Sequence, residues 1–440
     1  MIEPAETELV VETELINRGI VDGPEVPDMG PPTDEIPLSR NRDFQVVLVG
    51  QGLSSLGDAV TFTALPILVL ALTGSGIAMG VVGTLGTLPD LLLGLPAGAF
   101  ADRLDRRKMM FSADLGRAVL TALIPISVAL DGPTMGVILL VAFPINALRV
   151  LWLAAYTAAV PGLVGRSQVG RANGIFEAVF NIGFVLGPSI AGILALTIGP
   201  GPTIAVDAIS FFISAAAILF VRRPLKPPPR TVDTHLVAEM REGVAYVVSH
   251  PILRTVILYW GLVAIGTGGL TQALTYHMEI DRGLGSAVLG FVISAFGIGS
   301  LIGAVIATKL VGGVLGRNML IGTFITGLAI LTIVFEPPVP VVIAAAFIAG
   351  IAQSNVLIAY ITLRTNHSPD ALLGRVGSTA RLVSVGLTPI GLLTAGFIID
   401  AANGATALAA MGVWSLALTI AFGVSATIRG ARSPAVRPTA

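Results

Sequence analysis

The chain has 440 residues, of which 54% are hydrophobic and 12% are charged, and its formal net charge at pH 7 is −1. Soluble domains carry about 25% charged residues, so a chain this long and this apolar cannot hide its surface in one soluble core, and the composition predicts a membrane protein. The balanced charge disfavours nucleic acid as a partner, and the absence of cysteine excludes disulfides, thiolate metal sites and cysteine nucleophiles.

The first 41 residues differ in composition from the rest of the chain. Residues 1–39 hold ten acidic residues, several prolines and a single cation, Arg18. Such a segment buries too little apolar surface to fold, so we expect a disordered tail over residues 1–41. It lacks the basic start and apolar centre of a signal peptide. A solvated tail is the simplest interpretation, and a regulatory segment is the alternative.

Twelve apolar stretches follow the tail, and each is long enough to cross a bilayer as a helix of about 20 residues. They lie at residues 44–72, 78–101, 108–130, 134–160, 171–197, 201–221, 252–279, 285–309, 318–335, 339–362, 376–399 and 404–428. We therefore predict an all-α membrane protein with twelve transmembrane helices.

Lysine and arginine lie almost entirely in the loops on one side of the predicted spans. Only Arg282, which follows the seventh span, falls on the other side. Because cytoplasmic loops are enriched in these residues, both chain ends are expected in the cytoplasm. An odd number of spans would break this alternation, so the charge pattern supports the count of twelve.

The segment between the sixth and seventh spans divides the chain into two halves. Residues 223–250 begin with prolines, and then Leu236, Met240, Val244 and Val247 recur at helical spacing, which predicts an amphipathic helix on the cytoplasmic surface. Six spans (residues 42–222) precede this linker, six (residues 251–428) follow it, and residues 429–440 form a cytoplasmic tail. Glycines recur at corresponding places in the halves, as in carriers that alternate access to a central cavity, although glycine is also simply common in membrane helices.

A polar run interrupts the apolar sequence after the second span. It holds four cations and two acids behind a glycine, which is typical of a short cytoplasmic hairpin between membrane helices. The run reads Gly98-Ala99-Phe100-Ala101-Asp102-Arg103-Leu104-Asp105-Arg106-Arg107-Lys108.

Several motifs together resemble the major facilitator superfamily. Gly98-x-x-x-Asp102-Arg103-x-x-Arg106-Arg107-Lys108 looks like its loop motif, and Gly183-x-x-x-Gly187-Pro188-x-x-x-Gly192 looks like the helix-five motif associated with antiporters. The segments Leu56-Gly57-Asp58, Arg171-Ala172-Asn173-Gly174 and Gly374-Arg375-Val376 resemble the drug-export branch, which includes macrolide efflux proteins and the enterobactin exporter. The resemblance covers about residues 42–428 and implies two pseudo-symmetric six-helix bundles.

The resemblance also assigns roles to two of these motifs. The loop motif latches the halves together on the cytoplasmic face, with Asp102 set against the N-terminus of span eleven, where the helix dipole favours an anion. Arg381 lies near that end and is expected to join this gate, which comprises Gly98, Asp102, Arg103, Arg106, Arg107 and Arg381. The helix-five motif, which comprises Gly183, Gly187, Pro188 and Gly192, implies a bend and close helix packing and favours export over uptake.

Ionisable residues inside the predicted spans cost about 2.5–3.5 kcal/mol each on insertion scales, which makes them candidates for function. All seven informative ones lie in the first half: Asp58, Asp90, Asp114, Arg117, Arg149, Glu177 and Asp207. A carboxylate at Asp58 can gain a proton and lose it when a cation approaches, as proton-coupled export requires. A purely structural hydrogen bond is the alternative.

The other buried charges each have two interpretations. Arg149 is either a coupling residue or half of a fixed ion pair, and the glycine that the family places after it is missing here. Asp114 and Arg117 share a helical face and are expected to pair structurally, with a substrate contact as the alternative. Glu177 either binds a cationic substrate or pairs with Arg117 or Arg149. Asp90 and Asp207 are assigned to helix packing.

The second half is nearly free of charge inside its spans. Its polar residues are expected to shape the substrate cavity, and the candidates are Gln272 and Tyr276 in span seven and Gln353 and Asn355 in span ten.

These features predict a secondary active transporter that exports an amphipathic small molecule, such as a drug, macrolide or siderophore, by proton antiport. A nutrient or lipid facilitator or symporter and a transporter-shaped receptor without turnover are the alternatives. No phosphate-binding loop, metal-ligand cluster or nucleophile motif is visible, so we expect no enzyme activity, cofactor or metal. The expected setting is a bacterial plasma membrane, with a small-molecule substrate, protons and the lipid bilayer as partners of a monomer.

Overall fold

The computed structural model describes residues 36–223, 225, 236–310 and 313–432. Within these residues all regular secondary structure is helical, and twelve helices are long and apolar enough to cross a membrane, which confirms the prediction. The first six spans are α2 (Arg42–Thr73), α3 (Gly76–Arg103), α4 (Arg106–Ala129), α5 (Thr134–Val164), α6 (Val169–Ile198) and α7 (Pro200–Leu219).

The seventh span is segmented into α9 (Pro251–Thr267), α10 (Leu270–Tyr276) and a π-helical turn (His277–Asp281). The last five spans are α11 (Gly285–Leu310), α12 (Leu315–Val334), α13 (Val339–Asn366), α14 (Leu373–Ala401) and α15 (Gly404–Gly423). Short 3-10 turns (Arg166–Gln168 and Asp370–Leu372) and α16 (Ala426–Arg429) complete the described elements.

The ends of the first two spans follow from local sequence signals. The side chain of Asn41 accepts a hydrogen bond from the Phe44 amide and starts α2, and Gly74, at φ 64°, ends it in the left-handed conformation that glycine adopts freely. Ser75 then caps α3 by accepting a hydrogen bond from the Ala78 amide. The C-cap of α2 and the N-cap of α3 are therefore adjacent residues, and the chain reverses direction between the two helices there.

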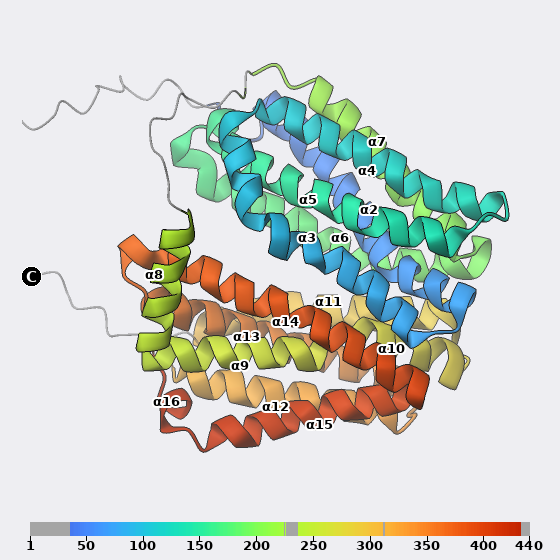
Figure 1. Ribbon diagram of the computed structural model, residues 1–440, viewed down its shortest axis with the longest axis vertical. Helices are drawn as coiled ribbons and strands as arrows, with labels where there is room; N and C mark the ends of the chain where they lie inside the picture. The colour runs from blue at the N-terminus through green and yellow to red at the C-terminus, as the bar shows by residue number, and fades with distance from the viewer. Residues whose placement is uncertain (1–35, 224, 226–235, 311–312, 433–440) are drawn as a thin grey trace, which may run out of the picture.

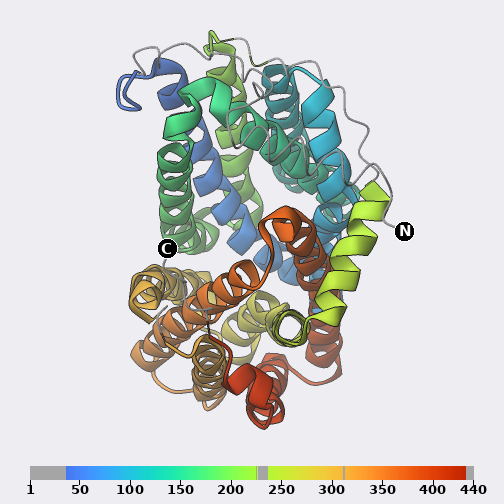
Figure 2. The same cartoon turned by 90° about the vertical axis from the view of Figure 1, so that its left-hand side faces the viewer.

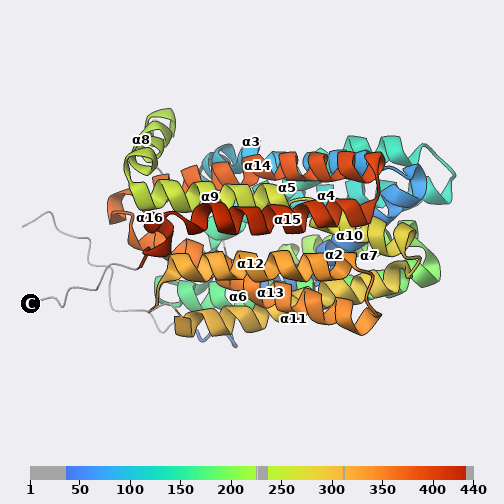
Figure 3. The same ribbon diagram turned by 90° about the horizontal axis from the view of Figure 1, so that it is seen from below.

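The six spans of each half form a separate bundle (Figure 1). The blue-to-green helices α2 to α7 lie above the yellow-to-red helices α9 to α15 in that view, and the long helices of the second bundle run along the molecule (Figure 3). The predicted linker helix, α8 (Leu236–Ser249), lies across one end of the molecule, which we call the α8 end (Figure 2). We call the opposite end the far end.

The hydrophobic core changes between these two ends. At the far end one cluster joins both halves, with Met79, Ile138 and Ile204 of the first half beside Leu289 and Leu408 of the second. Toward the α8 end the core splits into two clusters, one on α2, α4 and α5 and the other on α9, α12 and α13. Among the described residues, the halves therefore share a core only at the far end.

Glycines line the two seams at which the halves meet. In the α3–α14 seam, a Cβ added to Gly396 would lie 2.5 Å from the Gly76 carbonyl oxygen, and in the α6–α11 seam a Cβ on Gly290 would lie 2.3 Å from the Pro188 carbonyl oxygen. No side chain fits at such distances, so glycine is required for this approach. Nearer the α8 end, a Cβ on Gly94 would meet no atom within 4 Å.

The break in span seven is a departure from the single helix that the sequence predicts over 252–279. Gly268 and Gly269 separate α9 from α10 and press against α14, where a Cβ on Gly269 would lie 2.2 Å from that of Ala395. The hydropathy of the segment is continuous across this joint, so hydropathy alone does not show it.

The structure also shows where parts of the predicted tail and linker pack. Residues 36–41, assigned to the tail from composition, pack on the first half: Leu38 is buried, and the Asn41 carboxamide donates to the Leu163 carbonyl at 2.8 Å. The remainder of the predicted tail lies outside the described residues. The linker helix α8 packs on α14, where Glu242 pairs with Arg375 at 2.5 Å.

Candidate functional site: a cavity between the halves and a buried charge cluster

The first buried ion pair joins Asp58 to Arg117. Asp58 lies midway along α2 and Arg117 midway along α4, with 2.5 Å between Oδ1 and Nη2. The arginine side chain is 2% exposed, and its guanidinium carbon lies 3.8 Å above the centre of the Phe211 ring, whose face attracts a cation. Asp58 is 26% exposed, so it is the partner that water reaches.

Two further carboxyl groups surround this pair. Asp207 of α7 is buried beside it, and a Cβ on Gly57 would lie 2.6 Å from Asp207 Oδ1, so the glycine that precedes Asp58 makes room for this second acid. Asp114 of α4 is fully buried and accepts hydrogen bonds from Trp152 Nε1 at 3.0 Å and Ser214 Oγ at 2.7 Å. Three carboxyl groups therefore lie near one guanidinium, of which only Asp58 forms an ion pair with it. We call Asp58, Asp114, Arg117 and Asp207 the charge cluster.

The cluster differs from the predicted arrangement. Arg117 pairs with Asp58 rather than with Asp114, because Asp114 is taken up by Trp152 and Ser214. Trp152 stacks on Tyr156 with ring centres 5.3 Å apart, and Tyr156 stacks on Phe176 at 4.3 Å. Trp152, three residues after Arg149, thus holds Asp114 in place.

A second ion pair, between Arg149 of α5 and Asp90 of α3, lies in a wetter setting. Their side chains are 36% and 21% exposed, and Asn146 accepts a hydrogen bond from Arg149 Nε at 3.4 Å. Asp90 also lines a small cavity of about 140 Å³ between α3 and α14, together with Gly94 and Arg381. Of the two interpretations of Arg149, a coupling residue or half of a fixed ion pair, the second requires an ion-pair partner, and Asp90 is in that position.

Glu177 is exposed on α6, and its backbone carbonyl accepts a hydrogen bond from the Asn181 carboxamide at 2.7 Å. Among the described residues, no ion pair joins it to Arg117 or Arg149.

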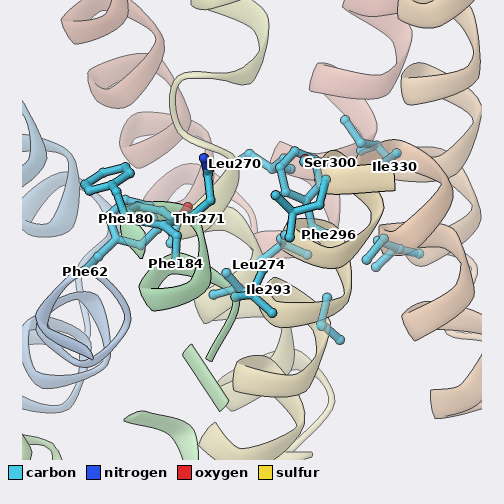
Figure 4. A pocket seen from close by; sticks show the side chains of 18 residues that line it. Phe62, Phe180, Phe184, Leu270, Thr271, Leu274, Ile293, Phe296, Ser300 and Ile330 are labelled. Atoms are coloured by element: carbon cyan, nitrogen blue, oxygen red, sulfur yellow. The ribbon is translucent and has the colours of Figure 1, made fainter. Parts of the chain in front are cut away.

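A cavity lies between the halves and is mostly apolar. Its volume is about 370 Å³, within the range of small-molecule sites. The first half contributes an aromatic wall in which Phe184 lies 5.4 Å from Phe62 and 5.5 Å from Phe180, measured between ring centres (Figure 4). The second half contributes residues of α10, α11, α12 and α13, including Leu274 and Phe296.

The polar groups on this cavity are few and uncharged. Asn181, Thr271 and Ser300 line it, and none of the described residues that do so carries an ionisable side chain. The surface thus suits an apolar or aromatic body with a small number of hydrogen-bonding groups.

The four polar residues expected in the cavity are placed elsewhere. Gln272 is buried against Gly83 of α3, and Tyr276 packs beside the far-end core. The Asn355 carboxamide donates to the Ile351 carbonyl at 2.8 Å, and Gln353 keeps a buried side-chain oxygen without a partner. The Asn355 amide thus finds its hydrogen-bond partners in the packing between helices, and Thr271, next to Gln272 on α10, lines the cavity.

The two family motifs occupy helix seams and helix ends. Gly183 and Gly187 admit α2, where a Cβ on Gly187 would lie 2.4 Å from that of Ala59, whereas Pro188 and Gly192 face α11. One face of α6 thus packs on α2 in its own bundle, and the adjacent face packs on α11 of the other half.

The loop motif joins helix ends of the first half. Arg106 Nε donates to the Ala101 carbonyl at 3.2 Å, and Arg107 Nη2 donates to the Leu219 carbonyl at 2.6 Å at the end of α7. Arg103 is exposed, and Asp102 is half-buried at the end of α3. A Cβ added to Gly98 would have no atom within 4 Å.

Sequence reasoning missed the aromatic wall, although a signal for it exists. Phe180 and Phe184 are four residues apart on α6, a spacing that puts them on one helical face. It also missed Gly57 as the residue that admits Asp207.

Comparison with known proteins decides the family. The model of the Major Facilitator Superfamily matches residues 47–318, which is more than half of the chain. The chain belongs to the major facilitator superfamily. It is therefore a multi-pass membrane transporter and not an enzyme.

Two superfamily relatives are similar over most of their length. The multidrug efflux pump Tap of Mycolicibacterium fortuitum is 30% identical over 367 residues, which cover 81% of this chain and 89% of that protein. The enterobactin exporter EntS of Escherichia coli O1:K1 / APEC is 26% identical over 378 residues, which cover 85% and 86%. Both match the drug-export branch suggested by the sequence motifs.

Solved transporter structures share the fold. The nucleoside transporter NupG gives a TM-score of 0.72 at 12% identity, covering 87% of this chain and 98% of that one. A bacterial homologue of the lysosomal transporter Spinster, in an inward-facing and unoccupied conformation, gives 0.68 at 15% identity, covering 88% and 96%.

Proposed function

We propose that this transporter exports an amphipathic small molecule with an apolar or aromatic body across the plasma membrane, by alternating access and in exchange for protons. The observation that carries the proposal is the uncharged, phenylalanine-walled cavity between two halves that share a core only at the far end. The efflux activities in the names of its relatives support the same direction of transport.

The orientation follows from the loop charges. Lysine and arginine gather at the α8 end, which we assign to the cytoplasm together with both chain ends. A far-end seam that is closed while the α8 end is open then corresponds to an inward-facing conformation. On opening of the far end, the loop motif at Asp102 and the nearby Arg381 would latch the α8 end.

Proton coupling is assigned to the charge cluster. A proton on Asp58 cancels its charge and releases Arg117 from the ion pair, and the arginine then faces the two buried carboxyl groups. Asp58 and Phe62 lie one turn apart on α2, and Phe62 lines the cavity. Movement of one short helical segment therefore links the proton site to the substrate site.

The proposal is tested by efflux of lipophilic drugs and catecholate siderophores from loaded cells, with and without a proton uncoupler. We expect at least one of these substrates to leave faster than from cells without the protein, and the uncoupler to remove the difference. Efflux that survives the uncoupler would contradict proton exchange. Net uptake in the same cells would favour a facilitator or symporter.

The cavity is tested by Phe184→Ala. This change removes one ring from the cavity wall, and because an aromatic contact with the substrate contributes about 0.5–1.5 kcal/mol, the substrate concentration for half-maximal export should rise by up to about tenfold. Phe212→Ala is the matched control, because Phe212 is 61% exposed on α7 and does not line the cavity. Equal effects of the two changes would remove the cavity from the transport path.

A further inference from the structure

The far-end seam contains a carboxylate that reaches from one half to the other. Asp400, near the end of α14, accepts hydrogen bonds from the Ser75 hydroxyl at 2.7 Å, from the Ile77 amide at 3.1 Å and from the Gly76 amide. These three donors belong to the N-terminus of α3, in the opposite half. Asp400 therefore binds backbone groups that the first turn of a helix leaves without internal partners.

This contact is not needed to form α3. Ser75 already caps the helix from within its own half, by accepting a hydrogen bond from the Ala78 amide at 3.1 Å. The contact of Asp400 is instead available only when the helix ends touch, and Gly76 and Gly396 make that approach possible. The hydrogen bonds of Asp400 therefore stabilise the closed far end rather than the helix α3 itself.

The charge of Asp400 suits this position. The N-terminus of α3 carries the positive end of the helix dipole, which attracts an anion, and its free amide groups orient towards the carboxylate. When the far end opens, the same amides and the carboxylate become hydrated separately. The contact thus distinguishes the two states of the transporter.

We propose that Asp400 is the outer latch of this transporter, a positioning residue that holds the far end closed in the inward-facing state. The proposal rests on the alternating access proposed above. It gives α3 and α14 a reciprocal design: the carboxylate at the end of α3, Asp102, is expected to meet the start of α14 in one state, and the carboxylate at the end of α14 meets the start of α3 in the other.

The test measures opening of the far end without any substrate. Ser294 is 6% exposed in the α6–α11 seam, so Ser294→Cys provides a single thiol in a chain that has no natural cysteine. A membrane-impermeant maleimide applied at the far-end face should label this thiol about three- to thirtyfold faster in Asp400→Ala, since loss of a helix cap shifts an equilibrium by about that factor. Asp400→Asn, which keeps one acceptor oxygen, should fall between.

The matched control is Asn403→Ala. Asn403 caps α15 at the same end by accepting a hydrogen bond from the Thr406 amide at 2.8 Å, but both residues lie in one half. It should leave the labelling rate unchanged. Equal labelling of the parent and both Asp400 variants, or equal acceleration by Asn403→Ala, would overturn the latch. Faster labelling of Asp400→Ala in cells where the parent protein shows no uncoupler-sensitive export would leave the latch standing and count against the proposed function.

Discussion

Asp58→Asn is expected to abolish proton-driven export, lowering the uncoupler-sensitive rate at least about tenfold. Asparagine keeps the size of the side chain but cannot carry a proton between the two faces, and it leaves Arg117, which is 2% exposed, without its anionic partner. Loss of one partner of a buried pair costs about 3–5 kcal/mol, so expression and thermal unfolding must be measured beside transport. The double change Asp58→Asn with Arg117→Gln removes both charges and should recover stability but not coupling.

Two comparisons make this result specific. Asp131→Asn alters an exposed carboxylate of the same half at a φ of 47°, a conformation that asparagine adopts well, and should leave export unchanged. Asp90→Asn breaks the pair with Arg149 instead. Uncoupler-sensitive export that survives Asp58→Asn and fails in Asp90→Asn would move the coupling site from the charge cluster to Arg149.

A disulfide between Ser189→Cys and Ser294→Cys is expected to stop transport reversibly. The two hydroxyl oxygens lie 2.7 Å apart across the α6–α11 seam, close to the separation that a disulfide bridges. The natural chain has no cysteine, so no other thiol competes. Oxidation should lower export at least about tenfold by locking the far end, and a reducing agent should restore it.

The control for this lock is a cross-link within one half. Ser127 Oγ and Thr134 Oγ1 lie 3.2 Å apart at the far end of α4 and α5, both in the first half. The same oxidant should therefore form a disulfide in the double variant Ser127→Cys with Thr134→Cys, but this disulfide does not connect the two halves. This double variant should transport in both redox states. Full export by the oxidised, cross-linked Ser189–Ser294 variant would mean that the far end need not open, and alternating access would have to be abandoned.

The spans and the linker helix were predictable because hydropathy is a local property. The spans follow the predicted segments to within a few residues, and a helix lies at 236–249, between the two halves. In span seven, Gly268 and Gly269 were visible in the sequence, but two glycines in a membrane helix signal close packing as readily as a break.

The charge partners could not be read from the sequence, because they depend on how helices far apart in the chain meet. Spacing within one helix suggested Asp114 for Arg117, whereas tertiary packing brought Asp58 from α2. The cavity illustrates the same limit. Polar residues of the second half suggested a polar site, but Asn355 bonds to backbone within the helix packing and the phenylalanines of α6 face the cavity instead.

The break in span seven places one wall of the cavity on a short separate helix. The short segment α10 carries Leu270, Thr271 and Leu274 on the cavity, while its Gln272 touches α3 of the other half. On the other side of the joint, α9 remains packed in its own bundle. Gly268 and Gly269 lie against α14, the helix that carries Asp400, so the segment that lines the substrate cavity packs directly on a helix of the outer seam.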